Sequence, residues 1–163
     1  MTCKEKLIAY LREQEVPFTL QQHRVAYTAQ EVAASEHLPG DIVAKVVIVF
    51  AGPEMLMLVL PASRRADLVK VALAAGVANA WLADEHELAE IFPDCELGAM
   101  PPFGNLYGLP VYVDERLAQN EYIVFQAGTH TDTISIAYAD FARLVKPKVV
   151  DVVRDARALG GDF

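Results

Sequence analysis

The residue whose type and position most strongly suggest chemistry is Lys45. It interrupts an apolar run, residues 42–50, that otherwise has the composition of a buried β-strand. Side chains alternate across a strand, so Lys45 shares a face with Val43, Val47 and Val49. An ammonium group on that face is unfavourable unless a polar or anionic group meets it. Two interpretations stay open: Lys45 lines a cleft for an anionic ligand, or it extends its amine to water along its own stem.

A second candidate segment is the loop predicted at residues 94–110, which is rich in glycine and proline. Within it, Gly98 permits close approach of the backbone to a ligand, and Pro101 and Pro102 hold the chain rigid. So long a segment without regular structure is uncommon inside a domain. Loops of this kind usually carry function.

A turn and a strand end add polar groups. Gly128, Thr129 and His130 lie between two predicted strands and offer a hydroxyl and an imidazole. An ordinary hairpin turn with an exposed histidine explains them equally well. Asp114 ends a predicted strand and can instead cap the residues that follow it. Taken singly, these signals are weak.

Several catalytic and metal-binding signatures do not occur in the sequence. It contains no GxSxG, GxxxxGK[ST] or GxGxxG motif. The segment 86–90 is similar to a zinc-protease helix, but Glu90 stands where the second histidine belongs, which favours a solvated acidic helix face. Cys95 shows no neighbouring base, so we interpret it as a small apolar residue rather than a nucleophile. We expect neither a metal nor a cofactor.

The composition is that of one globular domain: 163 residues, of which 53% are apolar. A net charge of −8 argues against a general nucleic-acid binder, although it permits a local basic patch for one end of an RNA. No apolar stretch approaches the ~18 residues of a membrane helix, and the N-terminus lacks a signal-peptide region. The cysteines, Cys3 and Cys95, are far apart, so we expect free thiols in a reducing cytoplasm.

The elements that must position these residues follow from caps and periodicity. Capping boxes at Thr2 and Thr28 predict helix starts, and Gly76 and Pro93 predict helix ends. The sequence predicts an α+β domain over residues 1–147 with a mixed, mostly antiparallel sheet, followed by a helical tail over 148–163. The predicted helices are 3–15, 28–38, 63–75, 84–92, 139–145 and 149–159. The predicted strands are 18–23, 42–50, 55–60, 110–113, 122–126 and 133–137.

The order of these segments resembles the YbaK / prolyl-tRNA synthetase-associated domain family of aminoacyl-tRNA deacylases. The resemblance runs from about residue 5 to Pro147. It implies a single-domain, barrel-like sheet surrounded by short helices, and an editing activity that removes a wrong amino acid from a charged tRNA. The matching segments are 28–33, 44–49, 98–104, 109–114 and 125–130.

The resemblance also implies roles for individual residues. Lys45 matches the family's essential lysine, expected to contact the terminal adenosine and its phosphate. Gly98 to Pro102 matches the loop that orients the ester through backbone groups, so Gly98 and Pro102 join Lys45 as catalytic candidates. The substrate-binding candidates are Thr28, Val46, Met100, Phe103, Asp114, Gly128, Thr129 and His130.

The substrate is left open within the class of small amino acids. In the alanine-specific branch an asparagine typically follows the lysine, whereas this chain has Val46. The partners implied are the 3′ end of an aminoacyl-tRNA and, for delivery of the substrate, an aminoacyl-tRNA synthetase; no membrane is implied. Two other readings remain: a non-catalytic module that binds an aminoacyl-adenosine-like ligand, and a structural interaction domain.

Overall fold

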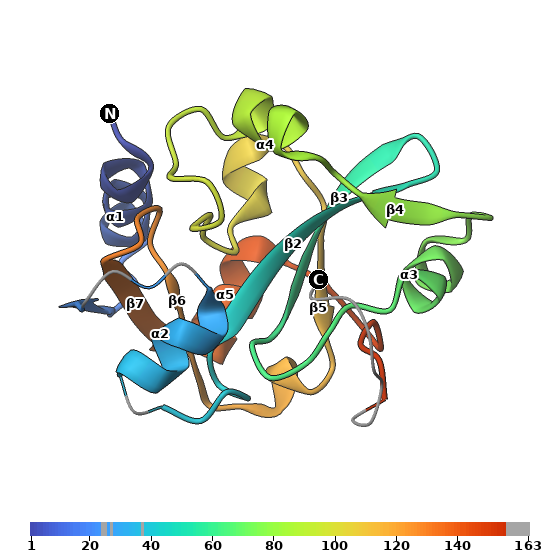
Figure 1. Cartoon of the computed structure of the whole chain (residues 1–163). Helices are drawn as coiled ribbons and strands as arrows, with labels where there is room; N and C mark the ends of the chain where they lie inside the picture. The colour runs from blue at the N-terminus through green and yellow to red at the C-terminus, as the bar shows by residue number, and fades with distance from the viewer. Residues whose placement is uncertain (24–25, 27, 37, 156–163) are drawn as a thin grey trace.

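Two β-sheets organise the computed structural model, which describes residues 1–23, 26, 28–36 and 38–155 (Figure 1). One sheet has five strands in the order β4-β2-β3-β5-β8, and the other has three in the order β1-β7-β6. An isolated parallel bridge between Val43 and Val124 joins them. The strands are β1 Thr19–Gln22, β2 Ala44–Ala51, β3 Glu54–Pro61, β4 Ala80–Leu82, β5 Val111–Asp114, β6 Tyr122–Gln126, β7 Asp132–Ala137 and β8 Lys148–Val150.

The predicted α+β class with a mixed, mostly antiparallel sheet is confirmed. β2 pairs antiparallel with β3 and β4, whereas β5 runs parallel to both β3 and β8. The expected barrel-like closure is wrong for the described residues. Their strands divide between two open sheets, and the edge strands β4 and β8 do not pair with each other.

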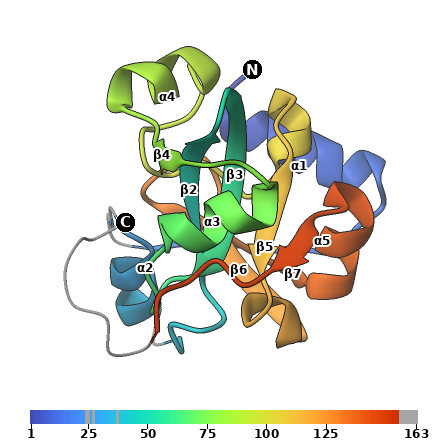
Figure 2. The same ribbon diagram turned by 90° about the vertical axis from the view of Figure 1, so that its right-hand side faces the viewer.

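Alternation along β3 separates two apolar cores. Met57 and Val59 face the larger core, which also holds residues of helices α1 (Cys3–Glu13) and α5 (Tyr138–Val145). Leu56 and Leu58 face the opposite side, where helix α3 (Leu68–Ala75) lies across the five-stranded sheet (Figure 2). Because β3 is covered on both faces, it is a nearly continuous apolar run. It therefore gives its neighbour β2 a fixed base.

The helices begin at polar caps, as the sequence predicts. Thr2 and Asp84 each form a complete capping box, and the Thr28 hydroxyl accepts a hydrogen bond from the amide of Glu31. Gly76 ends α3 in the left-handed conformation. The helices are α1 Cys3–Glu13, α2 Ala29–Ser35, α3 Leu68–Ala75, α4 Glu85–Ile91 and α5 Tyr138–Val145, with short 3₁₀ turns at Gly104–Tyr107 and Leu117–Gln119.

Helix α3 is shorter than predicted, which matters for the site. The sequence predicts a helix from residue 63, but α3 begins at Leu68. The carboxylate of Asp67 accepts hydrogen bonds from the amides of Val69 and Lys70 and so fixes the helix start. Residues 63–66 consequently stay non-helical and belong to the connection between β3 and α3.

The predicted helical tail is wrong over the described residues 148–155, and 156–163 lie outside the description. Lys148–Val150 forms β8 beside β5, and Val153 forms an antiparallel bridge with Ala66. The valines of this segment are β-branched and favour extended structure, and Val152 and Val153 are fully buried. The tail is thus an edge of the larger sheet.

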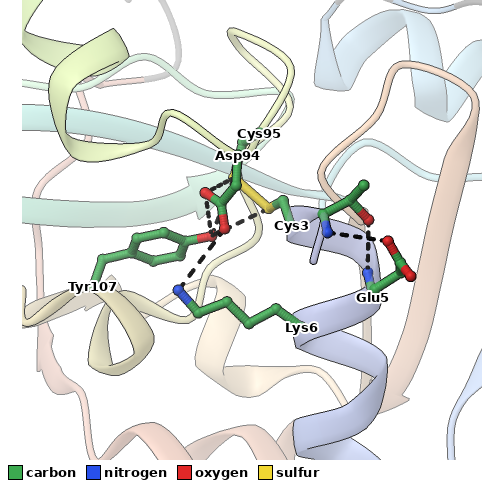
Figure 3. Close-up of a disulfide and its surroundings, with 7 residues drawn as sticks. Cys3, Glu5, Lys6, Asp94, Cys95 and Tyr107 are labelled. Carbon is green, nitrogen blue, oxygen red and sulfur yellow. Dashed lines mark hydrogen bonds and ion pairs between the residues drawn. A yellow bond between two sulfur atoms is a disulfide. The ribbon is translucent and has the colours of Figure 1, made fainter.

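The prediction of free thiols is also wrong. Cys3 and Cys95 form a disulfide across a sequence separation of 92 residues (Figure 3). Tertiary folding brings the start of α1 against the loop after α4, a proximity that sequence spacing does not reveal. The thiols therefore give no reason to assign a reducing compartment. In the described part of the chain, no helix is long and apolar enough to cross a membrane.

Candidate active site

A cavity of about 720 Å³ opens where α2 lies over the seam between the two sheets. Helix α2 and its N-cap contribute residues 28–31 and Ala34 to the wall, and β2 contributes residues 44–47. Individual residues from three other segments complete it: Arg65 after β3, Gly98 and Met100 from the loop after α4, and Gln126 at the end of β6. Five separate segments of the chain therefore converge on one hollow.

Lys45 lies on the wall of this cavity, on β2 opposite Leu60 of β3. Its side chain is half-buried, and its ammonium donates a 2.6 Å hydrogen bond to the carbonyl oxygen of Arg64. That carbonyl offsets part of the desolvation of the ammonium. Of the two interpretations left open, the geometry favours the lysine that lines a cleft. Its catalytic role stays a prediction.

The loop after α4 brings Gly98 and Met100 to the same cavity. Gly98 has φ of 86°, a left-handed conformation that side chains disfavour. Two backbone hydrogen bonds hold the loop in place: the amide of Glu96 donates to the carbonyl of Gly128, and the amide of Gly128 donates to that of Ala99. The loop is therefore fixed on either side of Gly98.

The turn of Gly128, Thr129 and His130 supports this loop and is not part of the cavity lining. A Cβ atom on Gly128 would lie 2.7 Å from Cys3 Sγ, so only glycine fits there. The His130 amide donates to the carboxylate of Glu96, and its imidazole Nε2 lies 2.8 Å from the carbonyl oxygen of Leu97. These contacts fit a positioning role more directly than contact with a ligand.

Three other candidates also lie outside the cavity lining. Phe103 is fully buried, with its ring 5.6 Å from Phe125 and 5.7 Å from Phe141 between ring centres, and the adjacent Pro102 is buried as well. Asp114 is fully buried and accepts hydrogen bonds from Arg116 and from the amide of Val152. It fastens the tail to β5. By contrast, Thr28 and Val46 do line the cavity.

Gln126 and Arg65 are among the cavity residues that the sequence analysis did not single out. Gln126 is buried and donates through Nε2 to the carbonyl of Ala26 at 2.9 Å. A polar residue ending the apolar strand at 122–126 was a usable signal, of the same kind as Lys45. Arg65 was hidden because residues 63–75 were assigned to a helix. Its cation gives the wall a second positive charge.

Beneath the loop, a carboxylate is held in its charged form. Asp132 is buried and contacts the ammonium of Lys4 at 3.0 Å and the hydroxyl of Thr129 at 2.6 Å. Burial alone would raise the pKa of Asp132, but the hydrogen bonds from Thr129 and Lys4, with the charge of Lys4, together hold it below the usual value. Asp132 thus fixes the start of α1 against the turn at 129–131.

The disulfide is surrounded by polar groups (Figure 3). The hydroxyl of Tyr107 lies within hydrogen-bond range of both sulfur atoms and of Asp94. Burial chiefly, and then the charge of Asp94 and its hydrogen bond, raise the pKa of Tyr107. Donor atoms of Cys3, Asp94 and Cys95 lie within 4.8 Å of one another, as in some metal sites. The two sulfurs are bonded to each other, so this cluster is a structural link.

Comparison with known proteins places the cavity in context. A family model described as the aminoacyl-tRNA editing domain matches residues 23–144. The multifunctional Ser/Thr-tRNA deacylase ProXp-y of Escherichia coli K12 is 31% identical over 102 residues, which are 62% of this chain and 60% of that protein. The proline–tRNA ligase of Thiobacillus denitrificans is 29% identical over 133 residues, 80% of this chain and 23% of the ligase. The chain thus spans less than two thirds of these relatives.

Solved structures show the same fold at low identity. A protein proposed to be a trans-editing enzyme for prolyl tRNA synthetase superposes with a TM-score of 0.81 at 18% identity, covering 95% of this chain and 99% of its own. The crystal structure of a hypothetical protein gives a TM-score of 0.83 at 18% identity, covering 91% and 99%. At this identity the likeness concerns the fold alone.

Proposed function

Because the chain belongs to the aminoacyl-tRNA editing domain family, we propose that it hydrolyses the ester bond of a tRNA mischarged with a small amino acid. The observation that carries this proposal is the meeting of Lys45 and Gly98 on one cavity wall. These residues are 53 positions apart by their numbers, 45 and 98, and come from different elements. Their convergence fits a site that holds a phosphate-bearing ester.

The reaction needs little from the protein besides placement. An aminoacyl ester is already activated, so water can add to its carbonyl carbon without a protein nucleophile. The bond to the ribose oxygen then breaks, the water's proton passes to that oxygen, and a free amino acid and an uncharged tRNA result. Correct placement supplies much of the acceleration. A rigid loop around Gly98 suits backbone donors that stabilise the developing oxyanion.

Within this mechanism Lys45 acts as an electrostatic anchor. An ammonium is a compact point charge suited to phosphate. The hydrogen bond to the Arg64 carbonyl directs it along the cavity wall. The 3′ end of an aminoacyl-tRNA is therefore the proposed partner, and a tRNA substrate would place the protein in the cytoplasm.

The acidic surface bears on delivery of the substrate. With a net charge of −8, contact with the body of a tRNA is expected to be weak. A synthetase that hands over the charged 3′ end is therefore a proposed second partner. The likeness to a proline–tRNA ligase over 80% of the chain supports this, since it shows the same kind of domain within a synthetase.

The test is a deacylation screen with purified protein. tRNAs charged with serine, threonine, alanine, cysteine and proline are incubated with the wild type and with Lys45→Met, which keeps an unbranched side chain that is one atom shorter and has no charge. We expect release of at least one small amino acid by the wild type and at least 100-fold slower release by the variant. No release of any amino acid by the wild type, with thermal stabilisation by the charged tRNA, would instead indicate a binding module.

A further inference from the structure

Arg65 lies on the same cavity wall as Lys45 and has no part in the roles given above. We propose that Arg65 is a second phosphate-binding residue, which together with Lys45 holds the 5′-phosphate of the terminal adenosine. This inference rests on the proposed function for its substrate. It adds a residue that neither the sequence patterns nor the family likeness singles out.

The first support is that the Lys45 ammonium lies beside the backbone that carries Arg65. The register pairs Lys45 with Leu60, and the chain continues from β3 into residues 63–66. The ammonium of Lys45 donates to the carbonyl oxygen of Arg64 at 2.6 Å. Arg64 directly precedes Arg65 in the chain. Both residues line the same cavity, which is the placement that a phosphate group shared between them requires.

The second support is the rigidity of the backbone that carries Arg65. The Arg154 amide donates to the Arg65 carbonyl at 2.8 Å, and the Arg64 guanidinium donates to the Arg154 carbonyl at 2.8 Å. Ala66 also bridges to Val153 of the tail. A residue that binds substrate works best from such a fixed base. The family match ends at residue 144, so the segment that fixes Arg65 lies beyond it.

The third support is charge. In a chain with a net charge of −8, the described residues of the cavity lining include two cations, Lys45 and Arg65, and one carboxylate, that of Glu31. A guanidinium offers a planar fork of donors that matches two phosphate oxygens, and an ammonium adds a point charge. This combination suits phosphate better than it suits a neutral ligand.

The experiment measures binding of AMP and of adenosine, which differ only in the phosphate, to the wild type, Arg65→Ala, Arg65→Lys and Arg12→Ala. Arg12 is exposed on α1 and lies outside the cavity lining, so Arg12→Ala removes the same charge elsewhere. We expect Arg65→Ala to weaken AMP binding about tenfold or more while adenosine binding changes less than about twofold. Arg65→Lys should retain part of the affinity, and Arg12→Ala should match the wild type.

A second experiment measures hydrolysis and tests this inference separately from the proposed function. Rates are measured with 3′-seryl-AMP and with 3′-seryl-adenosine, and Arg65→Ala should raise KM only for the phosphorylated substrate. Equal losses on both substrates, or equal binding of AMP and adenosine by the wild type, would overturn the phosphate role. A phosphate-dependent effect of Arg65 on binding without hydrolysis of any ester would uphold the inference and refute the deacylase.

Discussion

The ammonium of Lys45 donates to the main-chain carbonyl oxygen of Arg64 across 2.6 Å. This contact explains how a lysine is tolerated in an otherwise apolar strand. The carbonyl meets the cation and leaves it at the cavity wall rather than in the core. The same contact couples the lysine to the segment that carries Arg65, so two functional candidates share one support.

Replacing Lys45 by methionine should separate function from stability. The variant loses the charge but also the desolvation of the ammonium, and the Arg64 carbonyl loses its donor. These effects oppose each other, so we expect the free energy of unfolding to change by about 1 kcal/mol or less. Urea denaturation measures that change, and deacylation should fall as described above. A variant that deacylates at the wild-type rate would remove Lys45 from the site.

Gly98→Ala should damage activity through the backbone. Alanine at φ of 86° is strained, which costs about 1–2 kcal/mol or shifts the loop. A small displacement of the loop lowers the reaction rate roughly 100-fold. Gly76→Ala is the matched control because Gly76 has φ of 70°, lies at the end of α3 and has nothing within 4 Å of an added Cβ.

Both glycine variants are compared in urea denaturation and in single-turnover deacylation. Similar losses of stability with a rate loss confined to Gly98→Ala would support the role of the loop. Equal rates in the two variants would mean that the Gly98 backbone plays no part in the reaction.

The residue at position 100 should influence which amino acid enters. Met100 lines the cavity and is largely buried, so its size sets part of the available volume. We expect Met100→Ala to admit larger amino acids and Met100→Trp to exclude all but the smallest. The deacylation screen reports this as a change in the ranking of charged tRNAs. An unchanged ranking in both variants would place the selectivity elsewhere.

Breaking the disulfide should destabilise the protein markedly. Cys3 and Cys95 close a loop with a sequence separation of 92 residues, and loss of such a link costs about 2–5 kcal/mol. Denaturation with and without a dithiol reductant measures the loss. The double variant Cys3→Ser, Cys95→Ser should match the reduced wild type and should not respond to the reductant.

The buried carboxylate of Asp132 predicts a dependence of stability on pH. Its pKa lies below the unfolded value of about 3.9 because the stabilising contacts of Thr129 and Lys4 outweigh burial. A carboxyl group with a lowered pKa stabilises the fold above that unfolded value, and this contribution is lost as the pH falls through the folded pKa. We expect Asp132→Asn to cost about 1.5–3 kcal/mol at pH 7 and much less near pH 2. A difference from the wild type that is constant across this range would contradict the assignment.

The sequence predicts the structure correctly where neighbouring residues determine it. The capping residues Thr2 and Thr28 started helices as predicted, and Lys45 reached a cavity from its strand. Arg65 was missed because apolar spacing suggested a helix from residue 63, whereas the cap at Asp67 delays its start. The disulfide and the tail strand depend on contacts between distant segments. No local pattern reveals the disulfide, whereas the β-branched valines of residues 149–153 were a local sign of extended structure in the tail.

Phe103 shows another limit of prediction from the sequence, because a residue predicted to bind substrate lies outside the cavity. It occurs in a segment that resembles a ligand-binding loop, yet its side chain lies in the aromatic core. The motif predicted which loop lies at the cavity, but it did not predict which side chains of that loop face the cavity. Alternation and burial in three dimensions decide that.

The cavity draws its walls from both sheets, which are otherwise joined at the bridge between Val43 and Val124. A bound molecule would therefore contact both sheets and restrict their movement relative to each other. Slower amide exchange on loading would then be concentrated at Val124, whose amide donates to the carbonyl of Ile42, and the interior of β3 would change little.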